Sequence, residues 1–177
     1  MKIDLEYKIR CGRMSDINEH LPVLKQYGQK IDHITEFGLR GGDSTTAFLA
    51  ARPKSLLTYD INQACQATYD RLKVISEDCD FRFFCRDTLY SDILETDLLF
   101  IDSYHSFDQL AAELNRHHQM VKRYIIMHDT HTFGWRGEDR KEPGLKVAIA
   151  KFLATSKSWQ IHKVFLNNNG LTILERK

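Results

Sequence analysis

The stretch at residues 34–46 places the strictest limits on the fold of this chain. A short apolar run ends beside a carboxylate at Glu36, a glycine-rich turn follows at 38–42, and a Ser/Thr cluster at 44–46 can begin a helix. A strand that turns sharply into a helix leaves the first helical N–H groups unpaired, and glycines let a ligand approach the main chain. In an open α/β sheet, a nucleotide-type ligand binds at such a place.

Apolar runs and helical patterns alternate along the rest of the chain. This alternation predicts an α/β fold with a mostly parallel sheet and helices on both faces. The Asn-Gly pair at 169–170 indicates a hairpin, so the last strand is expected to be antiparallel to its neighbour. The expected strands lie at 33–37, 55–60, 81–85, 97–102, 124–128, 159–166 and 171–175, and the expected helices at 45–51, 63–76, 107–120 and 143–155.

We interpret residues 1–177 as one domain, because this length suits a single hydrophobic core. Residues 1–30 are expected to cap the ligand cleft. Within them, residues 1–14 are expected to be extended or irregular, and an amphipathic helix follows Ser15. Pro22 is placed to split or kink that helix, and Gly28 ends it.

Charge and composition exclude several classes of protein. The formal net charge is +1, so no whole-chain field draws the protein to nucleic acid or to an anionic membrane. No apolar run approaches the ~18 residues of a membrane span, and acids occupy the N-terminus where a signal peptide would be apolar. The four cysteines form no CxxC pair, which favours reduced thiols in a cytoplasmic protein.

Acids recur at the ends of the five strands that are expected to be parallel, and histidines join them at the last two. A single carboxylate in such a position can be a solvated cap. Several at one edge of a sheet favour a shared ligand that is cationic or rich in hydroxyls, or a metal. The acids are Glu36, Asp60, Asp87, Asp102 and Asp129, and the histidines are His105 and His128.

Five segments, at 36–45, 57–60, 97–107, 125–130 and 168–174, together resemble the class I S-adenosylmethionine-dependent methyltransferases. Within that class the chain is similar to the small cephalosporin hydroxylase-like and sugar O-methyltransferases. The resemblance implies a Rossmann-like, doubly wound, seven-stranded sheet of order 3-2-1-4-5-7-6 with an antiparallel C-terminal hairpin. It also implies methyl transfer from S-adenosylmethionine to an oxygen of a small molecule or sugar.

The resemblance further implies which residues contact the cofactor. A dinucleotide is the competing ligand, but Arg40 replaces the second glycine of its GxGxxG fingerprint. The implied residues are Glu36, Gly38 and Gly42 of the glycine motif, Ser44 near the cofactor carboxylate, Asp60 at the ribose hydroxyls, Asp87 at the adenine amine, and Asp102 beneath the methyl group.

The acids and histidines after the fourth and fifth strands form the candidate catalytic centre. Sugar methyltransferases of this kind bind magnesium through the fourth-strand acid and an acidic pair after the fifth strand. Here that pair is His128-Asp129, which departs from the oxygen ligands that magnesium prefers. A divalent cation (Mg or Mn) held by Asp102, Asp129 and His105 is therefore one interpretation, and a metal-free site is the other.

Histidine is the natural general base near neutral pH, because its ordinary pKa is about 6.5. The expected catalytic residues are His105, which follows Asp102 in a loop, Asp102 itself, and His128, for which a hydrogen-bonded structural role is equally apt. His131 is a further candidate. His117 and His118 are expected to be solvated, and His20, His33 and His162 receive no role.

The long polar loop at 130–142 is expected to line the acceptor pocket, with aromatic walls from Tyr104, Phe133 and Trp135. The expected partner is a small-molecule acceptor, with a sugar as one candidate. No membrane or nucleic-acid partner is expected, and a homodimer is left open. The alternative functions are a non-catalytic cofactor-binding module and a nucleic-acid methyltransferase.

Overall fold

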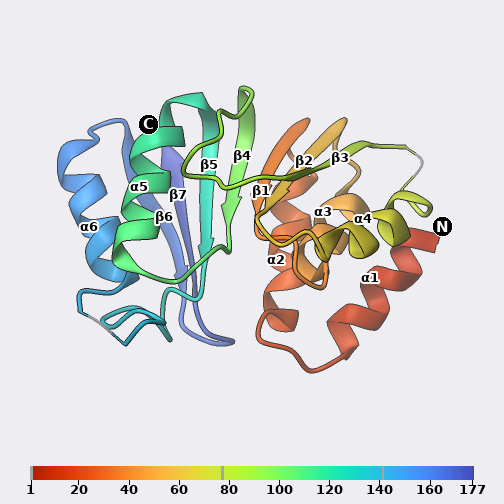
Figure 1. Cartoon of the computed structure of the whole chain (residues 1–177), viewed down its shortest axis with the longest axis horizontal. Helices are drawn as coiled ribbons and strands as arrows, with labels where there is room; N and C mark the ends of the chain where they lie inside the picture. Colours follow the sequence, from red (N-terminus) through yellow and green to blue (C-terminus); the bar gives the residue numbers. More distant parts are fainter. Residues whose placement is uncertain (1, 77, 141) are drawn as a thin grey trace.

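The computed structural model of the chain describes residues 2–76, 78–140 and 142–177. Its centre is a seven-stranded sheet of order β3-β2-β1-β4-β5-β7-β6, which confirms the expected topology (Figure 1). The strands are β1 (His33–Phe37), β2 (Ser55–Asp60), β3 (Asp80–Cys85), β4 (Thr96–Ile101), β5 (Val121–His128), β6 (Trp159–Phe165) and β7 (Leu171–Arg176).

The first five strands are parallel, and their register brings their C-terminal ends to one edge of the sheet. Phe37 of β1 lies opposite Tyr59 of β2 and Ile101 of β4. Ile101 in turn lies opposite Met127 of β5. The residues that follow these strands therefore meet at the same edge. β7 is antiparallel to both β5 and β6, as the Asn-Gly hairpin predicts.

Helices pack on both faces of the sheet through two apolar layers. One layer includes Leu24, Phe48 and Leu72, and the other includes Leu114 and Phe152. Among the described residues, no helix is both long and apolar enough to cross a membrane. The helices are α1 (Lys2–Gly12), α2 (Leu21–Gly28), α3 (Asp43–Ala51), α4 (Cys65–Lys73), α5 (Phe107–His117) and α6 (Leu145–Thr155), with short 3-10 helices at Asn18–His20 and His118–Met120.

The expectation of an irregular N-terminus is wrong, because residues 2–12 form α1. Ile3 is its one fully buried residue, and Tyr7 and Cys11 on the same face are partly buried against the core, so its apolar stripe is short and weak. Ion pairs hold it in place: Arg10 contacts Asp43 at the start of α3, and Glu6 contacts Arg71 of α4 at 2.9 Å. The helix thus depends on tertiary contacts rather than on its own pattern.

The helix expected after Ser15 is split near Pro22, as expected: a 3-10 helix at Asn18–His20 precedes α2, which begins at Leu21. Pro22 lies in the first turn of α2, which suits a residue without an N–H donor.

One other local expectation needs correction. His117, expected to be solvated, is 1% exposed, and its Nε2 donates to the main-chain oxygen of Thr88 at 2.9 Å. It faces the ring of Phe37 across the apolar layer.

Candidate active site

A cavity of about 670 Å³ opens at the C-terminal edge of the parallel strands. It is lined by the residues that follow all five of those strands and by residues of several loops. A second cavity, of about 450 Å³, extends from it toward the glycine turn and the start of α3. The first cavity is lined by Gly38, Asp60, Asp87, Asp102 and Asp129 from the strand ends and by Asp16, Tyr104, His105, Phe133 and Glu138 from the loops, among others.

The glycine turn after β1 needs both of the glycines that the motif singled out. Gly38 has φ +94°, and a side chain there would overlap the main-chain oxygen of Asp102 on β4. Gly42 has φ +79°, and a Cβ there would press on Thr68 and Leu72 of α4. Gly38 lines both cavities, and Gly42 lines only the second.

Glu36 lies beneath this turn and does not line either cavity. Its carboxylate is fully buried and accepts hydrogen bonds from the hydroxyls of Ser44 (2.7 Å), Thr45 (2.8 Å) and Thr58 (2.8 Å). Burial outweighs these bonds and raises the pKa of Glu36 to about 7. The hydroxyl of Ser44, expected near a cofactor carboxylate, is thus donated to Glu36.

Asp60 and Asp87 both face the first cavity, as expected. Asp60 Oδ2 accepts the N–H groups of Leu39 (2.9 Å) and Arg40 (3.1 Å), so it also fixes the glycine turn. Its Oδ1 accepts one N–H, from Asn62 at 2.8 Å. The Cys65 thiol also contacts this carboxylate, so Asp60 both lines the cavity and fixes the surrounding loops.

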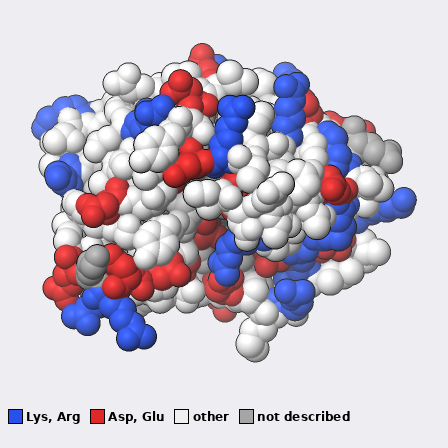
Figure 2. Space-filling view, viewed as in Figure 1, with Lys and Arg blue, Asp and Glu red and all other residues white. Residues whose placement is uncertain are grey.

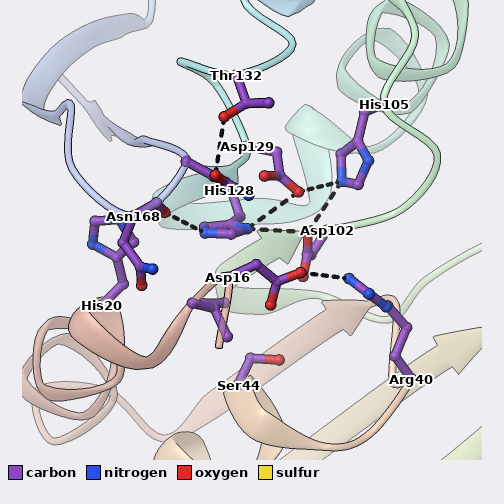
Figure 3. Close-up of polar contacts among 12 residues, drawn as sticks. Asp16, His20, Arg40, Ser44, Asp102, His105, His128, Asp129, Thr132 and Asn168 are labelled. Carbon is purple, nitrogen blue, oxygen red and sulfur yellow. Dashed lines mark hydrogen bonds and ion pairs between the residues drawn. The ribbon is translucent and has the colours of Figure 1, made fainter. Parts of the chain in front are cut away.

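Four side chains converge at the other end of the cavity (Figure 3). His105 Nε2 lies 2.9 Å from Asp129 Oδ2 and 3.2 Å from Asp102 Oδ1. His128 Nδ1 lies 3.4 Å from each of the same two oxygens. Asp102, His128 and Asp129 are buried, and the His105 side chain is 12% exposed. We call Asp102, His105, His128 and Asp129 the His–Asp cluster; the structure brings these predicted residues together.

The charges of the cluster depend strongly on one another. Burial disfavours every charged form here, but the ion pairs outweigh it. They lower the pKa of Asp102 to about 2 and that of Asp129 further, and they raise the pKa values of His105 and His128 to about 10. Both imidazoles are therefore protonated at neutral pH when protons are the only cations present. An imidazolium cannot accept a proton, so the ordinary histidine pKa behind the expected base does not apply.

The outer nitrogen of each histidine is tied to an oxygen outside the cluster. His128 Nε2 donates to the main-chain oxygen of Asn168 at 3.2 Å, and His105 Nδ1 donates to Glu138 Oε2 at 2.9 Å. When the rings are neutral, their inner nitrogens carry lone pairs that point at the two aspartates. Among the described residues, His128 Nδ1 and Asp129 Oδ1 are buried without a hydrogen-bond partner.

This donor set fits a divalent cation. One ligand atom each from Asp102, His128 and Asp129 lies within 4.8 Å of the others, and His105 Nε2 contacts both carboxylates. Two carboxylates with imidazoles suit manganese, iron or zinc better than magnesium, which prefers oxygen ligands only. This three-residue group has His128 where the expected set has His105, whose Nε2 lies 2.9 Å from Asp129 and 3.2 Å from Asp102.

The sequence did not predict that His20 and the turn at residues 167–170 contact the cluster and its neighbouring loop. The turn of the terminal hairpin, residues 167–170, lies beside the C-terminal end of β5, where Leu171 pairs with His128. The main-chain oxygen of Asn167 accepts His20 Nε2 at 2.9 Å, and His20 meets His128 edge to face with ring centroids 5.6 Å apart. Asn169 accepts two N–H groups from the start of the 130–142 loop. An Asn-rich turn predicts a hairpin, but it carries no signal of these contacts.

Of the remaining predicted site residues, some line the cavity and others do not. Tyr104 and Phe133 line the first cavity, as expected of aromatic walls. Trp135 is 69% exposed, does not line that cavity, and lies near Lys146. His131 is exposed and lies outside the cavity lining, so it does not join the His–Asp cluster.

Comparison with known proteins identifies the fold. No family model and no curated protein matches the sequence. A solved protein from Corynebacterium glutamicum matches with a TM-score of 0.75 at 13% identity, over 99% of this chain and 90% of that one. A Podospora anserina methyltransferase bound to S-adenosylhomocysteine matches at 0.71 and 14%, over 99% and 87%. The O-methyltransferase TomG of Streptomyces achromogenes, bound to S-adenosylmethionine, matches at 0.69 and 14%, over 93% and 82%. The chain has the fold of these proteins.

Proposed function

We propose that this chain is an S-adenosylmethionine-dependent methyltransferase of class I that methylates an oxygen of a small molecule. One observation carries the proposal: the 670 Å³ cavity is lined by the ends of all five parallel strands, with a glycine turn after β1 and acids after β2 and β3. Two proteins that share the fold were solved with S-adenosylmethionine or S-adenosylhomocysteine bound.

In this proposal the cofactor lies across the strand ends. Gly38 leaves the main chain open beside the methionine part, Asp60 Oδ1 accepts from the ribose, and Asp87 accepts from the adenine amine. Glu36 acts indirectly, because it holds Ser44 and the start of α3 beneath the turn. Asp102 lies at the boundary of the two cavities and so adjoins both the cofactor and the His–Asp cluster.

Methyl transfer from a sulfonium is an in-line displacement: the C–S bond breaks while the C–O bond forms, and the acceptor oxygen loses its proton. We propose that the His–Asp cluster holds a divalent cation of the manganese, iron or zinc class, with His105 and His128 as neutral donors. When bound, such a cation supplies a lowered pKa for the acceptor hydroxyl. The proton that the acceptor hydroxyl loses passes to water at the mouth of the cavity, because the paired carboxylates of Asp102 and Asp129, with their lowered pKa values, are poor proton acceptors.

The acceptor in this proposal is a small polyhydroxylated molecule such as a sugar. Tyr104 and Phe133 offer aromatic surfaces, while Asp16 and Glu138 offer acceptors for hydroxyl groups. A nucleic acid is disfavoured, because Figure 2 shows acidic and basic side chains mixed on the displayed face, and binding to phosphate backbones needs clustered basic groups.

Calorimetry with S-adenosylhomocysteine tests the cofactor. We expect binding that weakens at least about tenfold in Asp60→Asn, since a lost charged hydrogen bond costs about 1.5–3 kcal/mol. Asp80→Asn is the matched control, because Asp80 starts β3 at the opposite edge and pairs with Arg82. Absence of binding at millimolar ligand refutes the cofactor. Release of S-adenosylhomocysteine from S-adenosylmethionine with sugars and catechols then separates an enzyme from a binding module.

A further inference from the structure

The 130–142 loop contacts His105 through a stacked ring and two hydrogen bonds. Phe133 stacks on the imidazole with ring centroids 4.9 Å apart and planes 9° apart. The N–H of Glu138 donates to the main-chain oxygen of His105 at 2.8 Å, and the Glu138 carboxylate accepts from His105 Nδ1 at 2.9 Å. Gly137 passes so close that an added Cβ would touch His105 and Ser106. The loop therefore orients this ring rather than merely covering it.

Glu138 differs from the neighbouring acid Glu142 of the same loop. Glu142 pairs with Arg136 at 2.9 Å, and both side chains are about two-thirds exposed, at 66% and 63%. Glu138 is 47% exposed and instead reaches the imidazole of His105, whose side chain is 12% exposed. A surface pair such as Arg136–Glu142 contributes little, whereas a carboxylate on the outer nitrogen of a buried imidazole determines where the inner nitrogen points.

The two histidines of the cluster are held in equivalent ways. In each, the outer nitrogen donates to a fixed oxygen, Asn168 O for His128 and Glu138 Oε2 for His105. Imidazole ligands of metals commonly donate their second nitrogen to a carboxylate or carbonyl, which fixes the ring and makes the ligand more basic. One of these two supports comes from a main-chain group, and the other comes from a side chain that can be changed.

We propose that Glu138 is a positioning residue that sets His105 as a donor to a divalent cation in the His–Asp cluster, so that the 130–142 loop and the cation stabilise each other. This inference rests on the cation of the proposed function. The inference goes beyond the proposed function, because it makes the affinity for the cation depend on Glu138, a residue of the loop that lies outside the His–Asp cluster.

Mn²⁺ binding to the metal-free full chain, followed by the electron paramagnetic resonance signal of the free ion, tests the proposal. Manganese suits the test because soft sulfur ligands, such as the exposed Cys85 would offer, bind it poorly. We expect Glu138→Ala to weaken binding by about 10- to 100-fold. Glu138→Gln keeps an acceptor oxygen and should lose less. Glu142→Gln should bind as the wild type does, and all variants should melt at the wild-type temperature.

Three results would overturn the proposal: wild-type affinity in Glu138→Ala, an equal loss in Glu142→Gln, or no Mn²⁺ binding by the wild type. S-Adenosylhomocysteine binding is measured on the same samples and is expected to be unchanged in all variants. A chain that binds the cofactor product but shows either of the first two results retains the proposed methyltransferase function and loses only the role of Glu138. Absence of Mn²⁺ binding by the wild type also removes the proposed cation, while cofactor binding stands.

Discussion

Replacing Glu36 with glutamine is expected to stabilise the protein at pH 8 and to change its stability little at pH 5. Glu36 has no solvent exposure and accepts three hydroxyl hydrogen bonds. Burial has the largest effect on this carboxyl and raises its pKa, because it disfavours the charged form. The three hydroxyl hydrogen bonds lower the pKa, and the nearby charge of Asp102 raises it further. The pKa of Glu36 ends at about 7, compared with 4.5 for an ordinary glutamate.

The sign and size of the effect follow from linkage. Because the pKa is raised in the folded state, the stability contribution is complete below the unfolded value of 4.5 and is lost as the pH rises through 7. Each pH unit between the two values is worth about 1.36 kcal/mol, so the wild type loses about 3 kcal/mol by pH 8. Glutamine has the same shape and never ionises, so the variant avoids this loss.

Urea unfolding of wild type and Glu36→Gln from pH 5 to 9, with a chelator present, measures the effect. The His–Asp cluster titrates in both proteins, so the difference in free energy of unfolding isolates Glu36. We expect a difference below about 1 kcal/mol at pH 5 that grows to about 3 kcal/mol in favour of the variant at pH 8. Glu142→Gln, on the exposed loop, should show no such trend. A variant less stable than wild type at pH 8 would mean that the three hydroxyls hold an ionised carboxylate and outweigh burial.

Two further changes test the turn and the cluster. Gly38→Ala should cost about 2 kcal/mol or more in unfolding free energy and remove S-adenosylhomocysteine binding, because its Cβ would overlap the oxygen of Asp102 at a positive φ; Gly41→Ala, whose Cβ meets nothing within 4 Å, should retain both. The raised pKa values of His105 and His128 mean that Mn²⁺ binding must displace their protons. Mn²⁺ should therefore bind more tightly as the pH rises toward 10. A weakly buffered titration at pH 7 should show the release of about two protons per bound ion. If Mn²⁺ binds and no protons are released, both imidazoles are excluded as ligands.

The sheet was predictable because its strands are short apolar runs with clear ends. β1 and β2 match their expected ranges, and β5 begins three residues earlier than expected, at Val121 rather than 124. The extra residues include Lys122 and Arg123, which are exposed on the strand and so lack an apolar pattern. α1 could not be found in this way, because ion pairs to residues far along the chain hold it.

Some residues of the candidate site could be predicted from the sequence, and others could not. Asp60, Asp102 and Asp129 follow parallel strands, so the topology alone brings them to one edge. Glu138 and Asn168 reach their histidines across 33 and 40 residues of sequence. Those contacts depend on how two irregular loops close, which no local pattern encodes. Residue type therefore located the donors of the cluster, and only the three-dimensional structure located the groups that orient them.

The charge of the His–Asp cluster explains why one site can exist in two states. With both imidazoles protonated, two positive and two negative charges cancel. With a divalent cation and neutral imidazoles, the same cancellation holds, so exchange of two protons for one cation leaves the buried net charge unchanged. Burial strongly penalises uncompensated charge, and either state avoids that penalty. The outer hydrogen bonds from His105 to Glu138 and from His128 to Asn168 survive in both states, because they use the nitrogens that keep their protons. The proposed exchange of two protons for one cation would therefore leave the loops around the cluster in place.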